Sequence, residues 1–92
     1  MNRIGLGFIE TRGNAACVEA IDAMIKTADV ELVKKVEIGS ALVTAVVRGE
    51  VGAVKSAIEA GSDRAARVGE LICVNVIPSA HDGVFELMGV EK

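Results

Sequence analysis

Two stretches of the chain are apolar at almost every position, and they constrain the fold more than any other feature. They cover residues 41–47 and 71–77, in which only Thr44 and Asn75 are polar. An antiparallel strand covered on one face alternates apolar and polar residues, whereas a strand buried on both faces is apolar throughout. Pro78 ends the second stretch. The fold must therefore cover both faces of the sheet that contains these two strands, or its edges.

The rest of the chain divides into further strands and helices. Gly5 and Gly7 alternate with large apolar residues in the first strand, which leaves one face of it open to close approach by another element. Asn14 precedes a helical pattern and is a candidate N-cap. Apolar residues at steps of three and four indicate the helices. The elements predicted in this way are strands at 4–10, 30–38, 41–47 and 70–77, helices at 15–28, 50–68 and 81–88, and a loose tail at 89–92.

This order predicts one α/β (α+β) domain over residues 1–92, with its core at about 3–88. The pattern β-α-β-β-α-β is that of the ferredoxin-like fold, a four-stranded antiparallel sheet with two helices on one face, here followed by a short C-terminal helix. Two helices cannot cover both faces of the sheet. Since 51% of only 92 residues are hydrophobic, we expect other copies of the chain to bury the remaining apolar surface.

Composition argues against several classes of partner. Aromatic residues make up 2% of the chain and the net charge is −3, whereas nucleic-acid-binding surfaces are basic and stack bases on aromatic side chains. No stretch approaches the roughly 20 apolar residues of a membrane span, and the N-terminus lacks the pattern of a signal peptide. We therefore expect a cytoplasmic protein that binds neither nucleic acid nor membrane.

Few residues have the arrangement that catalysis or metal binding needs. Cys17 and Cys73 lie far apart in sequence and outside any ligand cluster, so we expect buried free thiols and no metal site. His81 is followed by Asp82 but has no nucleophile in a recognisable motif beside it, and we interpret it as a surface residue that caps the last helix. The sequence thus predicts no cofactor and no enzymatic activity.

Two other functions are compatible with the same fold. One is a regulatory module that binds a small metabolite at a subunit interface. The other is an acylphosphatase-like enzyme, which requires an arginine and an asparagine that converge on a phosphate. Arg12 and Asn75 are the candidates, and they are predicted to lie on different elements.

A set of ordered motifs, spread from Arg3 to Met88, resembles the hexamer-forming shell proteins of bacterial microcompartments. Each motif alone is weak, but their order and spacing together are specific. The motifs are GLGFIETRG at 5–13, IDAMIK at 21–26, IGS at 38–40, VRGEVGAVK at 47–55 and VIP at 76–78, with His81 shortly after.

The resemblance implies a homohexamer that tiles into the shell of a cytoplasmic organelle. In that family the loop that matches Gly39, Ser40 and Ala41 lines a central pore for small polar metabolites. Lys26 matches a lysine at the hexamer edge that packs against its counterpart in the next hexamer. The implied partners are further copies of the chain, other shell proteins and encapsulated enzymes.

The chain departs from the family's pattern in two regions, after the last strand and around the pore loop. The family often has Ile-Pro-Arg-Pro-His after the last strand, whereas here Ser79 and Ala80 precede His81. The edge formed by Ser79 and His81 therefore lacks an arginine, so we expect weaker or different contacts between hexamers. A basic residue is common where Glu37 stands, and a glycine where Ala41 stands. A ring of Glu37 carboxylates near the pore would disfavour anionic metabolites.

Overall fold

The computed structural model describes residues 4–89 and confirms the predicted order of elements. Arg3 and most of the tail predicted at 89–92 lie outside these residues. The described chain contains four strands and three helices, which are β1 (Ile4–Arg12), α1 (Asn14–Thr27), β2 (Val30–Ile38), β3 (Leu42–Glu50), α2 (Val51–Val68), β4 (Glu70–Ile77) and α3 (Asp82–Met88). No helix in this part of the chain is long and apolar enough to cross a bilayer.

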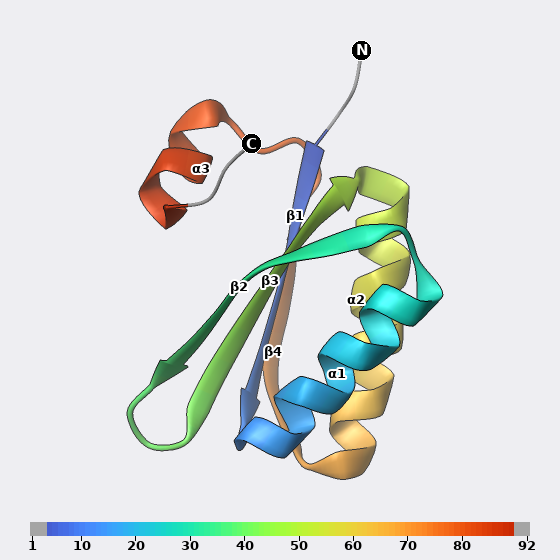
Figure 1. Ribbon diagram of the computed structural model, residues 1–92, viewed down its shortest axis with the longest axis vertical. Coiled ribbons are helices and arrows are strands. Elements are labelled where there is room, and N and C mark those ends of the chain that lie inside the picture. The colour runs from blue at the N-terminus through green and yellow to red at the C-terminus, as the bar shows by residue number, and fades with distance from the viewer. Residues whose placement is uncertain (1–3, 90–92) are drawn as a thin grey trace.

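The four strands form one antiparallel sheet in the order β2-β3-β1-β4, as the ferredoxin-like pattern predicts. Helices α1 and α2 lie side by side on one face of this sheet (Figure 1). Strands β2 and β4 are the two edges. The polar sequence of β2 suits this place, because most of its residues are exposed or half-buried.

The junction between β1 and α1 differs from the prediction. The first strand was predicted to end at residue 10, with Asn14 as the N-cap of the following helix, but β1 continues to Arg12, which pairs with Leu42. Gly13 is the N-cap instead, with φ of 96° and no side-chain cap hydrogen bond. Because β1 ends at Arg12 and α1 begins at Asn14, Gly13 alone must reverse the chain direction. Its positive φ allows this, and glycine adopts such a φ without steric cost.

The main core lies between the sheet and the two long helices. A Cβ atom on Gly7 would lie 2.8 Å from Cγ1 of Ile58 and 2.9 Å from Cγ1 of Val54. The open face of β1 therefore admits α2, as the glycines predicted. The largest group of buried side chains packs here and includes Ile9, Cys17, Ala20, Met24, Val43, Ala45, Val47, Val54, Ala57, Ile58 and Ala65.

The opposite face of the sheet is partly covered by α3. Phe85 of α3 packs against Leu6 of β1 and Val46 of β3, and all three are buried. The short helix thus covers part of the face that the two long helices leave open. Apolar surface remains exposed at the edge, where Ile72 and Val74 of β4 are 37% and 41% exposed. That other chains bury the second face or the edges therefore stays a prediction.

Candidate functional site

The turn at residues 39–41 joins β2 to β3 and is exposed at one end of the sheet. Ser40 and Ala41 have φ angles of 65° and 64°, in the left-handed region. This region costs a residue with a Cβ atom roughly 1–2 kcal/mol. The amide of Leu42 donates to the carbonyl of Gly39 over 3.5 Å, a length at the limit for a hydrogen bond. The turn therefore depends on contacts from outside itself.

Two donors from the end of β1 supply these contacts. Nη1 of Arg12 donates to the carbonyl of Ser40 over 3.2 Å, and the amide of Gly13 donates to the carbonyl of Ala41 over 2.6 Å. Both carbonyls are thus occupied by donors of the same chain. The amides of Ser40 and Ala41 have no hydrogen-bond acceptor within residues 4–89, so they can donate to other molecules, and the exposed Ser40 hydroxyl can both donate and accept.

Charges of opposite sign lie near the turn on opposite faces of the sheet. Glu37 pairs directly with Val43, which is part of the core beneath the helices, so Glu37 is on the helix-covered face. Arg12 pairs with Leu42, one residue away on the same strand, and therefore lies on the other face. The sequence indicated the residues of the turn but not this separation, which depends on strand register.

Lys26 lies in the last turn of α1 and its side chain is 72% exposed. Its Nζ atom is 3.0 Å from Oδ2 of Asp22, one helical turn earlier, which is the ion pair that the i,i+4 spacing predicts. Lys26 also borders a shallow groove of about 230 Å³ between α1 and α2. An exposed pair of this kind stabilises the chain little, so Lys26 can exchange its partner readily.

Ser79 and His81 lie in the connection from β4 to α3, and both are exposed. Nδ1 of His81 accepts a hydrogen bond from the amide of Gly83 over 3.0 Å. His81 is therefore the N-cap of α3, as the sequence indicated.

These residues occupy the end of the sheet opposite to the turn. The start of β2, which follows Lys26 and α1, pairs with Gly49, and Gly49 pairs with Gly5 near the start of β1. Ile77, which precedes Ser79, pairs with Leu6. The structure thus separates the turn at 39–41 from Ser79 and His81 by the length of the sheet, whereas Lys26 lies beside the middle of α2, near Ala60 and Asp63.

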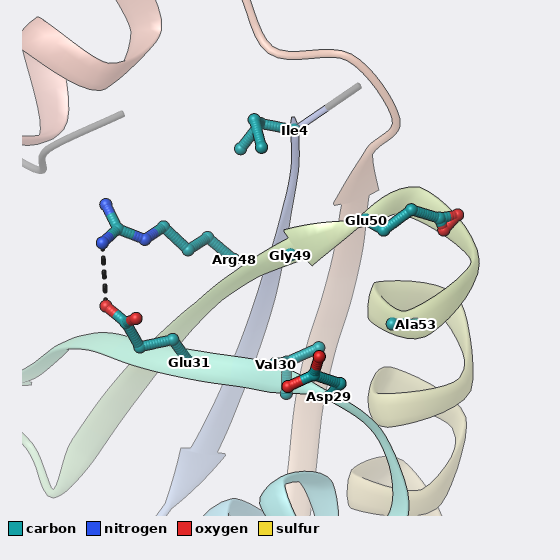
Figure 2. A pocket seen from close by; sticks show the side chains of 8 residues that line it. All are labelled: Ile4, Asp29, Val30, Glu31, Arg48, Gly49, Glu50 and Ala53. Atoms are coloured by element: carbon teal, nitrogen blue, oxygen red, sulfur yellow. Dashed lines mark hydrogen bonds and ion pairs between the residues drawn. The ribbon is translucent and has the colours of Figure 1, made fainter. Parts of the chain in front are cut away.

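A hollow of about 490 Å³ lies at the end of the sheet where β1 begins and β3 ends (Figure 2). Nη2 of Arg48 is 2.8 Å from Oε1 of Glu31 on one side of it. Glu50 points away toward α2, where both of its carboxylate oxygens accept from the amide of Gly52. No cluster of three or more potential metal ligands exists among residues 4–89. The described residues that line the hollow thus include an ion pair and a helix cap, and none of them is a serine, threonine or cysteine nucleophile.

The two cysteines are free, and they differ in exposure. Cys17 is buried as expected, and burial raises the pKa of its thiol. Cys73 is exposed on the edge strand, which corrects the expectation that it is buried. Its pKa is raised by partial loss of hydration and by Glu10, whose Oε1 atom accepts from the thiol over 3.6 Å. Both thiols are therefore poor nucleophiles at neutral pH.

The arrangement does not form the phosphate site of an acylphosphatase. Arg12 pairs with Glu70 and Asn75 pairs with Phe8, which places them four residues apart along β1. This separation is about 13 Å at the rise of a strand. The guanidinium of Arg12 is also engaged by Glu70, with 3.1 Å between Nε and Oε1. The two side chains do not converge on one phosphate.

Comparison with known proteins gives a consistent result. Residues 5–80 match the pattern of the BMC domain. The chain is 50% identical over 88 residues to the bacterial microcompartment shell protein PduA of Citrobacter freundii, which covers 96% of this chain and 95% of PduA. It is 51% identical over 85 residues to the shell protein EutM of Escherichia coli K12, covering 92% of this chain and 88% of EutM.

Similarity extends to carboxysomes and to a solved structure. The carboxysome shell protein CsoS1B of Hydrogenovibrio crunogenus is 46% identical over 90 residues, which are 97% of this chain and 93% of that protein. A crystal structure of a microcompartment protein from Desulfitobacterium hafniense DCB matches with a TM-score of 0.81 at 29% identity. The match covers 89% of this chain but only 44% of that one, so the present chain spans less than half of that protein.

Proposed function

Because the chain belongs to the BMC-domain family of bacterial microcompartment shell proteins, we propose that six copies form a ring around a central pore. The chain is a structural subunit of the shell and not an enzyme. It assembles with itself and with other shell proteins. Membership of this family argues against the main alternative, a regulatory module that binds a small metabolite.

The observation that carries the proposal is that the turn at 39–41 lies at one end of the sheet, whereas Ser79 and His81 lie at the other. In a ring of identical subunits, one end of each subunit faces the axis and the other faces the rim. The turn with Gly39, Ser40 and Ala41 would lie at the axis, and Lys26 at the rim. The chain measures 37 × 27 × 16 Å, a flat shape that suits a subunit of a thin layer.

The chemistry of the turn supports a pore for small polar metabolites. Both carbonyls of Ser40 and Ala41 accept from the protein itself. The Ser40 hydroxyl and the two unpaired amides are left to line the opening, so solutes with hydrogen-bond acceptors would pass best. A ring of Glu37 side chains would add negative charge on the helix-covered side of the layer and would disfavour anions there.

At the rim, Lys26 would pack against its counterpart in the neighbouring hexamer, with Ser79 and His81 nearby. Ser79 has no guanidinium to bind a neighbour, and the Nδ1 atom of His81 is already used as a helix cap. Contacts between hexamers would therefore rest mainly on Lys26. Encapsulated enzymes inside the organelle are further proposed partners, and the organelle itself lies in the bacterial cytoplasm.

Light scattering after size-exclusion chromatography tests the ring. The expected mass is about six times the 9.5 kDa of one chain, and negative-stain electron microscopy should show rings that associate into layers. A monomer or dimer at micromolar concentration would contradict the proposal. Exchange of Glu37 for lysine tests the pore, because the variant should admit anionic solutes faster into reconstituted shells than the wild type does.

A further inference from the structure

Arg12 connects three segments that are distant in sequence. Its Nη1 atom donates to the carbonyl of Ser40 over 3.2 Å, and its Nε atom lies 3.1 Å from Oε1 of Glu70. These partners are 28 and 58 residues away in the chain. The side chain therefore reaches from the end of β1 to the β2–β3 turn on one side and to the start of β4 on the other.

We propose that Arg12 is a positioning residue that holds the turn at residues 39–41 in its left-handed conformation, and that Glu70 directs the Arg12 guanidinium toward it. The proposal rests on the proposed function only in taking this turn as the lining of the pore. It assigns a role to two residues outside the turn.

The need for such a residue follows from the turn itself. Ser40 and Ala41 both have a positive φ, which a side chain with a Cβ atom disfavours. The turn's own hydrogen bond, from Leu42 to Gly39, is 3.5 Å long. Strained backbone persists only where its surroundings hold it in place, and Arg12 and the amide of Gly13 are the groups outside the turn that donate to its carbonyls.

The two hydrogen bonds from Arg12 and Gly13 to the turn, here called the tether, also determine which polar groups of the turn are free to bind other molecules. While Arg12 and Gly13 donate to the carbonyls of Ser40 and Ala41, those carbonyls are occupied by donors of the same chain. If the tether is lost, the peptide groups are free to rotate and to present acceptors at the surface. Arg12 would thus keep the lining of the opening rich in donors.

An arginine side chain has many rotamers, so a second group is needed to direct it toward the turn. Glu70 has this role. The ion pair between Arg12 and Glu70 is exposed, with side-chain exposures of 48% and 60%, so it stabilises the fold little. Its effect is directional, since a carboxylate on Nε restricts the plane in which the remaining guanidinium nitrogens lie.

Amide hydrogen exchange on the full chain in its native assembly tests this inference. The variant Arg12→Gln places a nitrogen near the position of Nε but cannot reach Ser40. The amides of Gly13 and Leu42, which bond to the turn, should then exchange about three- to tenfold faster, while the amides of Val46 and Val47 in the middle of β3 keep their rates. Glu70→Gln should produce a smaller acceleration at the same two amides.

Arg67→Gln is the matched control. It also removes an exposed arginine from an ion pair, with Asp63 at 3.6 Å, but this pair is on α2 and touches no turn. Wild-type exchange at Gly13 and Leu42 in Arg12→Gln would overturn the proposal, and so would an acceleration that extends evenly through β3.

Ala41→Gly separates positioning from simple stabilisation. Glycine tolerates the left-handed region, so the effect of Arg12→Gln should shrink in this background, and an undiminished effect would contradict the assigned role. The mass of each sample is measured in parallel by light scattering. A wild-type chain that forms no hexamer contradicts the proposed function and leaves the comparison of exchange rates valid.

Discussion

Nζ of Lys34 donates a hydrogen bond of 2.7 Å to the main-chain carbonyl of Met88. The bond joins edge strand β2 to the C-terminal end of α3, where carbonyls of the last turn lack partners within the helix. A cation at this end also interacts favourably with the helix dipole. Together with the His81 cap at the other end of the helix, it fixes α3 on the sheet face that α1 and α2 leave open.

Replacing Lys34 with methionine should loosen α3 while keeping most of the apolar side-chain stem. We expect the free energy of unfolding to fall by about 1 kcal/mol, the typical net contribution of a hydrogen bond. Amides of α3 should exchange faster in the variant. Lys55→Met, at an exposed position of α2, is the control and should change neither quantity. Urea unfolding at one fixed protein concentration measures both variants, and equal stability of Lys34→Met and wild type would contradict the role given to this bond.

Phe85 should contribute most of the binding of α3 to the sheet. It is 2% exposed and packs on Leu6 and Val46, so Phe85→Ala should destabilise the chain by about 3–5 kcal/mol. Leu87, on the same helix, is 84% exposed, and Leu87→Ala should change stability by less than about 0.5 kcal/mol. Denaturant unfolding of both variants at the same concentration would test this, and similar losses would show that α3 packs differently.

Ala41→Gly should make the chain more stable, although most replacements by glycine do the opposite. Ala41 has a φ of 64°, and relief of this conformation should raise the free energy of unfolding by about 1 kcal/mol. The control is Ala66→Gly at an exposed position of α2, which should lower it by about 1 kcal/mol. Thermal unfolding followed by circular dichroism distinguishes the two signs, and a lower melting temperature for Ala41→Gly would refute the assignment of strain.

Lys26→Ala should prevent extended layers and leave single hexamers intact, because Lys26 is at the end of α1, far from the turn at 39–41. Its loss should leave the fold almost unchanged, since the pair with Asp22 is exposed. Electron microscopy and light scattering measure layers and hexamers separately. Lys55→Ala is the control for the loss of a surface charge. Extended layers of Lys26→Ala would mean that another residue joins neighbouring hexamers.

Ser79→Arg should strengthen layers, because a guanidinium offers five donors in a fixed geometry to the neighbouring hexamer. Ser79 is exposed, so the larger side chain needs no repacking. Turbidity measured against protein concentration should show that the layers of the variant persist at greater dilution than those of the wild type. Ser79→Gln, of intermediate size and uncharged, serves as the control. Assembly identical to the wild type would indicate that a different contact already replaces the arginine in this chain.

Much of the fold was predictable because its signals are local. Helical spacing identified α1 and α2, and the apolar runs identified β3 and β4. The order of elements then restricted the sheet to one common topology. The errors occurred where a distant partner decides a local outcome. Pairing with Leu42 extends β1 to Arg12, and the position of β4 at the sheet edge leaves Cys73 exposed rather than buried.

The sequence by itself determined which segments are helices and strands, that the chain has more apolar surface than its two long helices can cover, and which family it resembles. These properties depend on residue type and spacing alone. Only the tertiary structure decided that Phe85 of α3 packs on Leu6 and Val46, that Glu37 and Arg12 lie on opposite faces of the sheet, and that Arg12 binds both Ser40 and Glu70. Such contacts depend on strand register and on side-chain direction, which are set when segments 28 and 58 residues apart in the chain meet in space.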